Sequence, residues 1–157
     1  MERVNIFKNG QKIIRVFGAF NAYLSKSTID KKLQHLILIR VSQINGCAYC
    51  IDMHTKDLRE MGETEQRMLM LTACHELPNL YTDRERAALG FAEALTKISN
   101  GGGLSDKVYA EAAMHFSDDE LLDLTVITIS INSANRINVA FRTPAGDYVP
   151  GQFSTAH

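Results

Sequence analysis

The sequence contains no tryptophan, only three prolines and only three cysteines in 157 residues. An odd number of cysteines argues against a framework of structural disulfides, so a hydrophobic core must hold the fold, and 45% hydrophobic residues suffice for one. No stretch offers about 18 uncharged apolar residues, which predicts that no segment spans a membrane. Residues 1–25 also lack a signal peptide, because polar residues interrupt every apolar run. The cytoplasm is therefore the expected location.

An excess of charge of either sign is missing as well. The 17 Lys and Arg residues nearly balance the 18 Asp and Glu residues, which leaves a formal net charge of −1. A protein that binds nucleic acid through its phosphates needs a dense basic patch, and the basic stretches here are short. We therefore expect neither nucleic acid nor a membrane as partner. The length fits a single domain, residues 1–157.

Apolar residues recur with helical spacing along most of the chain, and no strand-like alternation is strong enough to propose a sheet. The pattern predicts an all-α bundle of about six to seven helices. The expected helices cover residues 5–25, 29–45, 47–61, 64–75, 85–99, 105–116 and 118–141. Ser27 or Thr28 is the expected N-cap of the second helix. We expect a flexible loop at 100–103 and an extended arm or frayed tail at 142–157.

Cys47 and Cys50 form a CxxC motif, and His54 follows four residues after the second cysteine. In a reducing compartment this spacing indicates redox chemistry or metal binding more than a structural bridge. On a helix that begins near Cys47, the three side chains fall within an arc of about 60°. A helix N-terminus favours a thiolate, and an imidazole one turn away can take the thiol proton. The stretch therefore predicts a thiol enzyme.

Other interpretations of these residues stay open. The two cysteines can be small buried hydrophobes, with His54 on the surface. Cys47, Cys50 and His54 also supply three zinc ligands, although no second CxxC or HxxxH completes a structural set. We therefore expect no metal. Cys74 has apolar neighbours, which favours a buried, inert thiol.

Several polar residues elsewhere need an explanation. Asn132, Asn135 and Asn138 interrupt the otherwise apolar last helix. Buried polar groups require hydrogen-bond partners, so these residues should mark a helix end, a subunit contact or the rim of a pocket. His75 and His115 lie near expected helix ends, where a cation suits the helix dipole, and capping is the simplest account of them.

The stretch LILIRVSQINGCAYCIDMHT, residues 36–55, resembles the core of the carboxymuconolactone decarboxylase superfamily, and within it the AhpD-like alkylhydroperoxidase branch. The likeness continues at RERAAL, residues 84–89, and at residues 131–136. It covers most of the chain, from about residue 13 to 144. The resemblance implies an all-α fold and assembly into trimers or hexamers.

The resemblance also implies roles for the cysteines and two histidines. Cys50 would attack the peroxide and Cys47 would resolve the sulfenic acid as a disulfide, with His54 in the proton relay. The helix dipole alone would favour Cys47 as nucleophile, but His54 is spaced to serve Cys50. The relay in AhpD includes a glutamate twelve residues before the first cysteine, where this chain has His35. AhpD also has a histidine between the cysteines, where this chain has Tyr49. Because a histidine can relay protons near neutral pH, His35 is the fourth expected site residue, and a histidine without a role is the alternative.

The expected function is therefore a thiol-dependent peroxidase or disulfide reductase that reduces organic hydroperoxides in antioxidant defence. The sequence carries no flavin, haem or nicotinamide motif, so we expect no cofactor. Electrons must then come from a dithiol, either a protein or a small molecule. The alternative is a non-redox, carboxymuconolactone decarboxylase-like enzyme or binding protein in which the CxxC is incidental.

Overall fold

A computed structural model describes residues 1–100 and 103–153, and every regular element in these residues is a helix. The elements are α1 (Ile6–Asn9), α2 (Gln11–Leu24), α3 (Lys31–Asn45), α4 (Ala48–Glu60), α5 (Glu65–Met70), η1 (Leu71–Glu76), α6 (Asp83–Thr96), η2 (Ile98–Asn100), α7 (Asp106–Ala113) and α8 (Asp118–Phe141). The predicted all-α fold is confirmed. The described residues form eight α-helices and two short 3₁₀ helices, more than the six to seven expected. The expected loop at 100–103 and the last residues of the expected tail lie partly outside the described residues.

The additional elements arise where two expected helices are interrupted. The first helix divides at Gly10, whose amide donates to the carbonyl of Ile6 and ends α1. A Cβ atom at Gly10 would lie 2.4 Å from that carbonyl oxygen, so only glycine fits this turn without a shift of the backbone. The expected helix 64–75 stops being α-helical at Met70 and continues as η1, in which Ala73 departs from helical geometry.

The start of α3 differs from the prediction. The side chain of Asp30 accepts hydrogen bonds from the amides of Lys32 and Leu33, and Asp30 is therefore the N-cap. The predicted caps Ser27 and Thr28 are wrong, because the free amides of the first helical turn lie within reach of Asp30. This cap fixes the register of α3, and α3 carries one of the expected site residues.

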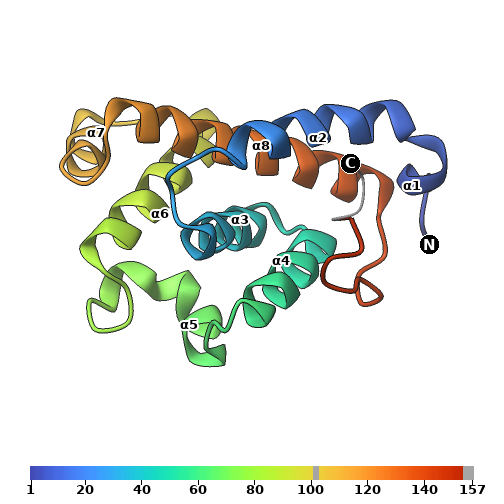
Figure 1. Cartoon of the computed structure of the whole chain (residues 1–157), viewed down its shortest axis with the longest axis horizontal. Coiled ribbons are helices and arrows are strands. Elements are labelled where there is room, and N and C mark those ends of the chain that lie inside the picture. Colours follow the sequence, from blue (N-terminus) through green and yellow to red (C-terminus); the bar gives the residue numbers. More distant parts are fainter. Residues whose placement is uncertain (101–102, 154–157) are drawn as a thin grey trace.

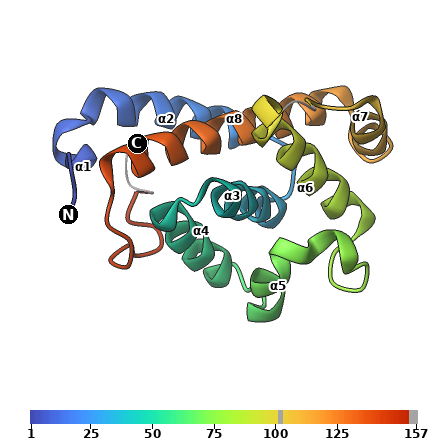
Figure 2. The ribbon, with the colours of Figure 1, turned by 180° about the vertical axis from the view of Figure 1, so that it is seen from behind.

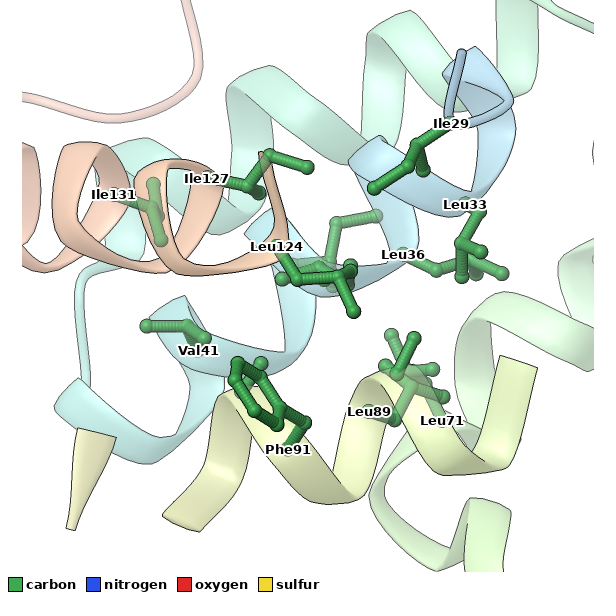
Figure 3. Packing of buried hydrophobic residues seen from close by; sticks show 14 of the residues in the cluster. Ile29, Leu33, Leu36, Val41, Leu71, Leu89, Phe91, Leu124, Ile127 and Ile131 are labelled. Atoms are coloured by element: carbon green, nitrogen blue, oxygen red, sulfur yellow. The ribbon is translucent and has the colours of Figure 1, made fainter. Parts of the chain in front are cut away.

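Helix α3 lies at the centre of the molecule, with α4, α6 and α8 packed around it (Figures 1 and 2). Helix α2 runs along the outer side of α8. In the core, side chains of α3, α6 and α8 face one another (Figure 3). The core residues of these helices that are almost fully buried include Leu36, Ile37, Ile39, Val41, Leu89, Phe91, Leu124, Ile127 and Ile131. Each such side chain contributes about 1.5–3 kcal/mol by leaving water, so the core holds α3 and α8 rigidly beside α4.

Residues 142–153 form an irregular arm that returns from α8 over α4 (Figure 1). The ammonium of Lys56 donates to the carbonyls of Gly146, at 2.6 Å, and Tyr148, at 3.1 Å. The hydroxyl of Tyr148 donates to Asp57 at 2.7 Å. The described part of the expected tail is thus a packed arm and not a frayed end. Within the described residues, none of the helices combines the length and the hydropathy that a bilayer span requires.

Candidate active site

A tight turn at Gly46 joins α3 to α4 and places the first cysteine. Gly46 ends α3 with φ 67° and ψ 32°, a left-handed conformation that glycine adopts without steric penalty. Cys47 follows in an extended conformation and caps α4, and its Sγ accepts a hydrogen bond from the amide of Cys50 at 3.3 Å. The expected helix start at Cys47 is therefore shifted by one residue, and Cys47 lies outside the helix it caps.

The two sulfurs of the CxxC motif are joined in a disulfide, with Cα atoms 5.4 Å apart. Cys50 lies in the first turn of α4, where unpaired amides and the helix dipole favour negative charge on its sulfur. Both cysteines are buried, Cys47 completely and Cys50 with 2% of its surface exposed. The fold thus brings the predicted pair together in a dry environment at a helix N-terminus.

His54 lies one turn after Cys50 on α4 and is also buried. Its burial, and to a smaller extent the charge of His35, lowers the pKa of His54 to about 3. In the disulfide form of the protein the imidazole of His54 is therefore neutral. A neutral imidazole can accept a proton. A thiolate at Cys50 would favour the protonated ring and raise this pKa, because an opposite charge nearby stabilises the imidazolium.

His35 approaches His54 from α3. The centroids of the two rings are 5.5 Å apart, and the rings meet edge to face at 73°. Burial lowers the pKa of His35, and within the described part of the chain the Nδ1 atoms of both histidines are buried without a hydrogen-bond partner. Asp57, on the next turn of α4, completes a group in which one potential ligand atom of each residue lies within 4.8 Å of the others. Asp57 was not among the residues expected from the sequence, although its spacing of three residues after His54 places both on one helix face.

Helix α8 supplies a contact to the disulfide that the sequence analysis did not assign. The side-chain amide of Asn138 donates to Sγ of Cys50 at 3.5 Å. The amide of Asn45 donates to Asn132, at 3.0 Å, and to Asn135, at 2.9 Å. Asn132 and Asn135 therefore have the partners expected of buried polar groups and join α8 to the end of α3 next to the CxxC. Asn138 joins α8 to α4, and its side-chain oxygen is buried without a partner among the described residues. The polarity of the three asparagines within an apolar helix was the signal in the sequence.

An aromatic cover lies over Tyr49, the residue that separates Ala48 from Cys50. The ring of Phe7 is 5.9 Å from that of Tyr49, and Phe153 of the arm stacks on Phe7 at 5.4 Å. The amide of Arg3 donates to the carbonyl at the end of α8, which holds the segment of Phe7 in place. Two open surface hollows lie between α6 and α7, and neither includes a cysteine among its lining residues.

A second histidine cluster joins η1 to α6. Nε2 of His75 lies 3.1 Å from Oε1 of Glu93, and Nε of Arg40 donates to the same oxygen at 2.7 Å. Hydrogen bonds with Cys74 and Glu93 raise the pKa of His75 to about 10. Burial raises the pKa of Glu93, but its bonds with His75 and Arg40 outweigh burial and lower that pKa to about 2. Cys74 is buried as predicted, and His75, expected to act as a simple cap, is instead paired with Glu93.

The sequence matches the model of the carboxymuconolactone decarboxylase family over residues 12–94, which make up more than half of the chain and include α3 and α4. The chain is similar to the uncharacterised protein YdfG of Bacillus subtilis, with 40% identity over 88% of this chain and 93% of that protein. The uncharacterised protein YnjA of Escherichia coli is 28% identical over 76% of this chain and 64% of its own length.

A solved structure from Agrobacterium tumefaciens matches this fold with a TM-score of 0.87 and 37% identity, over 94% of this chain and 100% of that one. That protein is of unknown function and is provisionally described as the antioxidant defence protein AhpD. The debrominase Bmp8 matches with a TM-score of 0.78 over 90% of this chain and 74% of its own, but at 19% identity this likeness shows the fold alone. From the family match and these similarities, the chain belongs to the carboxymuconolactone decarboxylase family and has the AhpD-like fold.

Proposed function

We propose that this protein is a thiol-dependent peroxidase that reduces organic hydroperoxides through Cys47 and Cys50. The observation that carries the proposal is the pairing of the two sulfurs at the N-terminus of α4, one turn before His54. Membership of the family and similarity to a protein described as AhpD-like support it. Antioxidant defence in the cytoplasm is the corresponding role.

The proposed catalytic cycle has two steps at the cysteines, followed by reduction of the disulfide they form. The thiolate of Cys50 attacks the terminal oxygen of the hydroperoxide, the O–O bond breaks, and the alcohol leaves with one proton while Cys50 becomes a sulfenic acid. The thiol of Cys47 then attacks the Cys50 sulfur, water leaves and the disulfide forms. An external dithiol, from a protein or a small molecule, reduces this disulfide by exchange through a mixed disulfide. Two electrons pass from the dithiol to the peroxide in each cycle.

Three neighbours assist the sulfur of Cys50 in this scheme. His54 takes the thiol proton, and the amide of Asn138 stabilises the thiolate by donating to it. His35, whose ring lies beside that of His54, passes the proton on in place of the glutamate of AhpD. We expect His35→Glu to retain peroxide reduction with a shifted pH profile, and His35→Leu to lose about 10²-fold in rate. A His35→Leu variant with the wild-type rate and pH profile would remove His35 from the relay.

A count of thiols tests the central proposal. The fully reduced, denatured wild type has three thiols, and one equivalent of cumene hydroperoxide before denaturation should leave one, that of Cys74. In Cys47→Ser, the sulfenic acid at Cys50 should persist and be trapped by dimedone. Cys50→Ser should keep both of its remaining thiols. If the wild-type pair stays reduced under excess cumene hydroperoxide, the protein is not a peroxidase.

The burial of both sulfurs favours a second candidate, a non-redox enzyme or binding protein of the same family. Under our proposal, a peroxide reaches Cys50 only after local opening of the residues that cover it. Reduced protein should then react faster with a small peroxide than with a bulky one. Mild denaturant should reduce the difference between these two reaction rates. In the non-redox candidate, the thiols react with neither peroxide before global unfolding, so the same experiment separates the two functions.

We also propose that the chain assembles into a homo-oligomer, a trimer or hexamer as in AhpD. Helix α2 has 14 residues, and only Leu24 among them is buried in the single chain. Val16 and Tyr23 leave about half of their surface exposed, at 56% and 49%. Multi-angle light scattering should give a mass of three or six chains, and Val16→Glu should lower it. A wild-type mass of one chain would contradict this part of the proposal.

A further inference from the structure

From the group formed by His35, His54 and Asp57, we infer a binding site for a divalent transition-metal ion of the zinc type between α3 and α4. One ligand-type atom of each residue already lies within 4.8 Å of the others. In a four-coordinate zinc site, bonds of about 2.0–2.1 Å place ligand atoms roughly 3.4 Å apart. Side-chain rotations that bring the three groups closer by up to about 1.4 Å therefore complete three ligands, and water takes the fourth position.

The unsatisfied atoms of the two histidines point to a ligand independently of this spacing. Nδ1 of His35 and Nδ1 of His54 are both buried and have no hydrogen-bond partner among the described residues. His54 exposes only 9% of its surface. A buried ring nitrogen without a partner is unfavourable, and a metal ion supplies one. A neutral imidazole offers a lone pair at one ring nitrogen, and either nitrogen of a histidine can ligate a metal ion.

The surroundings of the third ligand suit a cation. The hydroxyl of Tyr148 donates to one oxygen of Asp57, the kind of contact that orients a ligating carboxylate. Two nearby cations make their hydrogen bonds elsewhere, although the charge of Lys31 still acts on His35. Lys31 donates to the carbonyl of Leu24, and Lys56 to Asp52 and to the arm. The carboxylate of Asp57 therefore supplies negative charge that bound ammonium groups do not cancel.

The chain offers an internal comparison in the group of Cys74, His75 and Glu93, which has the same spacing limit of 4.8 Å. There Arg40 lies 2.7 Å from Glu93, and Lys97 lies 3.6 Å from it. A metal ion would have to compete with two cations that already neutralise the carboxylate. We therefore assign the ion to the His35 group and not to the His75 group.

The test uses the disulfide form of the full chain, which keeps Cys47 and Cys50 from binding the probe. Zn²⁺ titrated by calorimetry should bind one ion per chain, and Co²⁺ should give a visible spectrum of N/O ligation. His35→Ala and Asp57→Asn should each weaken Zn²⁺ binding at least about tenfold, while His75→Ala should leave it unchanged. Circular dichroism of each variant, and the milder Asp57→Asn change, guard against simple misfolding.

X-ray absorption at the zinc edge identifies the ligands directly, and a shell of nitrogen and oxygen without sulfur is expected. Absence of binding, a sulfur shell, or loss of binding in His75→Ala would each overturn the assignment. One consequence rests on the proposed function: bound Zn²⁺ withdraws His54 from Cys50 and should inhibit peroxide reduction. Because binding is measured without turnover, a failed peroxidase and a failed metal site give different results.

Discussion

The two histidine clusters of this chain bring similar side chains together and hold them in opposite charge states. Between α3 and α4, His54 has a cysteine one turn before it and Asp57 one turn after it, and its pKa falls to about 3. Between η1 and α6, His75 bonds to Cys74 and Glu93, and its pKa rises to about 10. The difference lies in direct bonding, because burial and the nearby His35 both lower the pKa of His54, whereas His75 has a thiol and an anionic partner within hydrogen-bond distance that raise its pKa.

The comparison suggests that the first cluster is built for proton transfer and the second for structure. A neutral, unpartnered imidazole beside a disulfide can change its protonation state during a reaction. An imidazolium fixed between a carboxylate and a thiol contributes to stability instead. The following measurements test this division.

The largest effect is expected when a sulfur is removed from one cluster or the other. Cys50→Ser should abolish the reduction of cumene hydroperoxide, because it removes the attacking atom. Cys74→Ala, in the second cluster, should leave the rate per folded enzyme unchanged. Stopped-flow assays of both variants with a dithiol reductant check this. Equal losses in the two variants would show that the clusters do not differ in function.

Loss of a carboxylate should affect stability most in the second cluster. Arg40 and Glu93 each expose only 13% of their side chains, so Glu93→Ala leaves a cation nearly buried without a partner. We expect a loss of about 3 kcal/mol in the free energy of unfolding, measured in urea. The exposed pair of Arg59 and Glu65 is the control, and Glu65→Ala should cost much less, because solvent screens an exposed ion pair.

The depressed pKa of His54 predicts a loss of stability in acid. Between the ordinary pKa of 6.5 and about 3, the unfolded state binds a proton that the folded state does not, so acidification favours unfolding. One such group gives a slope of up to about 1.4 kcal/mol per pH unit, and His35 adds to it in the same direction. Urea unfolding between about pH 6.5 and 4 should be less pH-dependent in His54→Leu than in wild type. The same replacement at His115 is the control.

The raised pKa of His75 acts in a different pH window and should have the smallest effect. Below 6.5 both states are protonated, whereas between 6.5 and about 10 only the folded state keeps the proton. Stability from this group is therefore lost as the pH rises. Since 47% of the side chain is exposed, solvent screening reduces the effect. When the free energy of unfolding is measured in urea as a function of pH, His75→Gln should flatten the alkaline side of the curve and leave the acid side unchanged.

Much of the fold could be predicted because the sequence is dominated by apolar residues at helical spacing and by a few helix-breaking residues. The long apolar pattern of α8 and the boundary at Gly62, with φ 78°, follow from local rules. The division at Gly10 and the change from α5 to η1 could not be predicted, since a single glycine or a non-helical Ala73 leaves the apolar period intact.

The site could be predicted only where its members are close in sequence. Cys47, Cys50 and His54 share one motif, and His35 entered through the family resemblance. The closeness of His35 to Asp57, the contact of Asn138 with Cys50 and the pairing of His75 with Glu93 depend on which elements pack together. Local patterns can single out such residues but do not contain their partners. The helices that bring them together are placed by the core, so these contacts became visible only with the fold.

The aromatic cover combines two segments that lie about 145 positions apart in the sequence, at Phe7 and at Phe153. Phe7 packs against the edge of the buried cluster around α3, whereas Phe153 is not part of it, so Phe153 can be exchanged without repacking the helices that hold the thiols. The covering of the CxxC segment at Tyr49 can therefore evolve separately from the chemistry of its sulfurs.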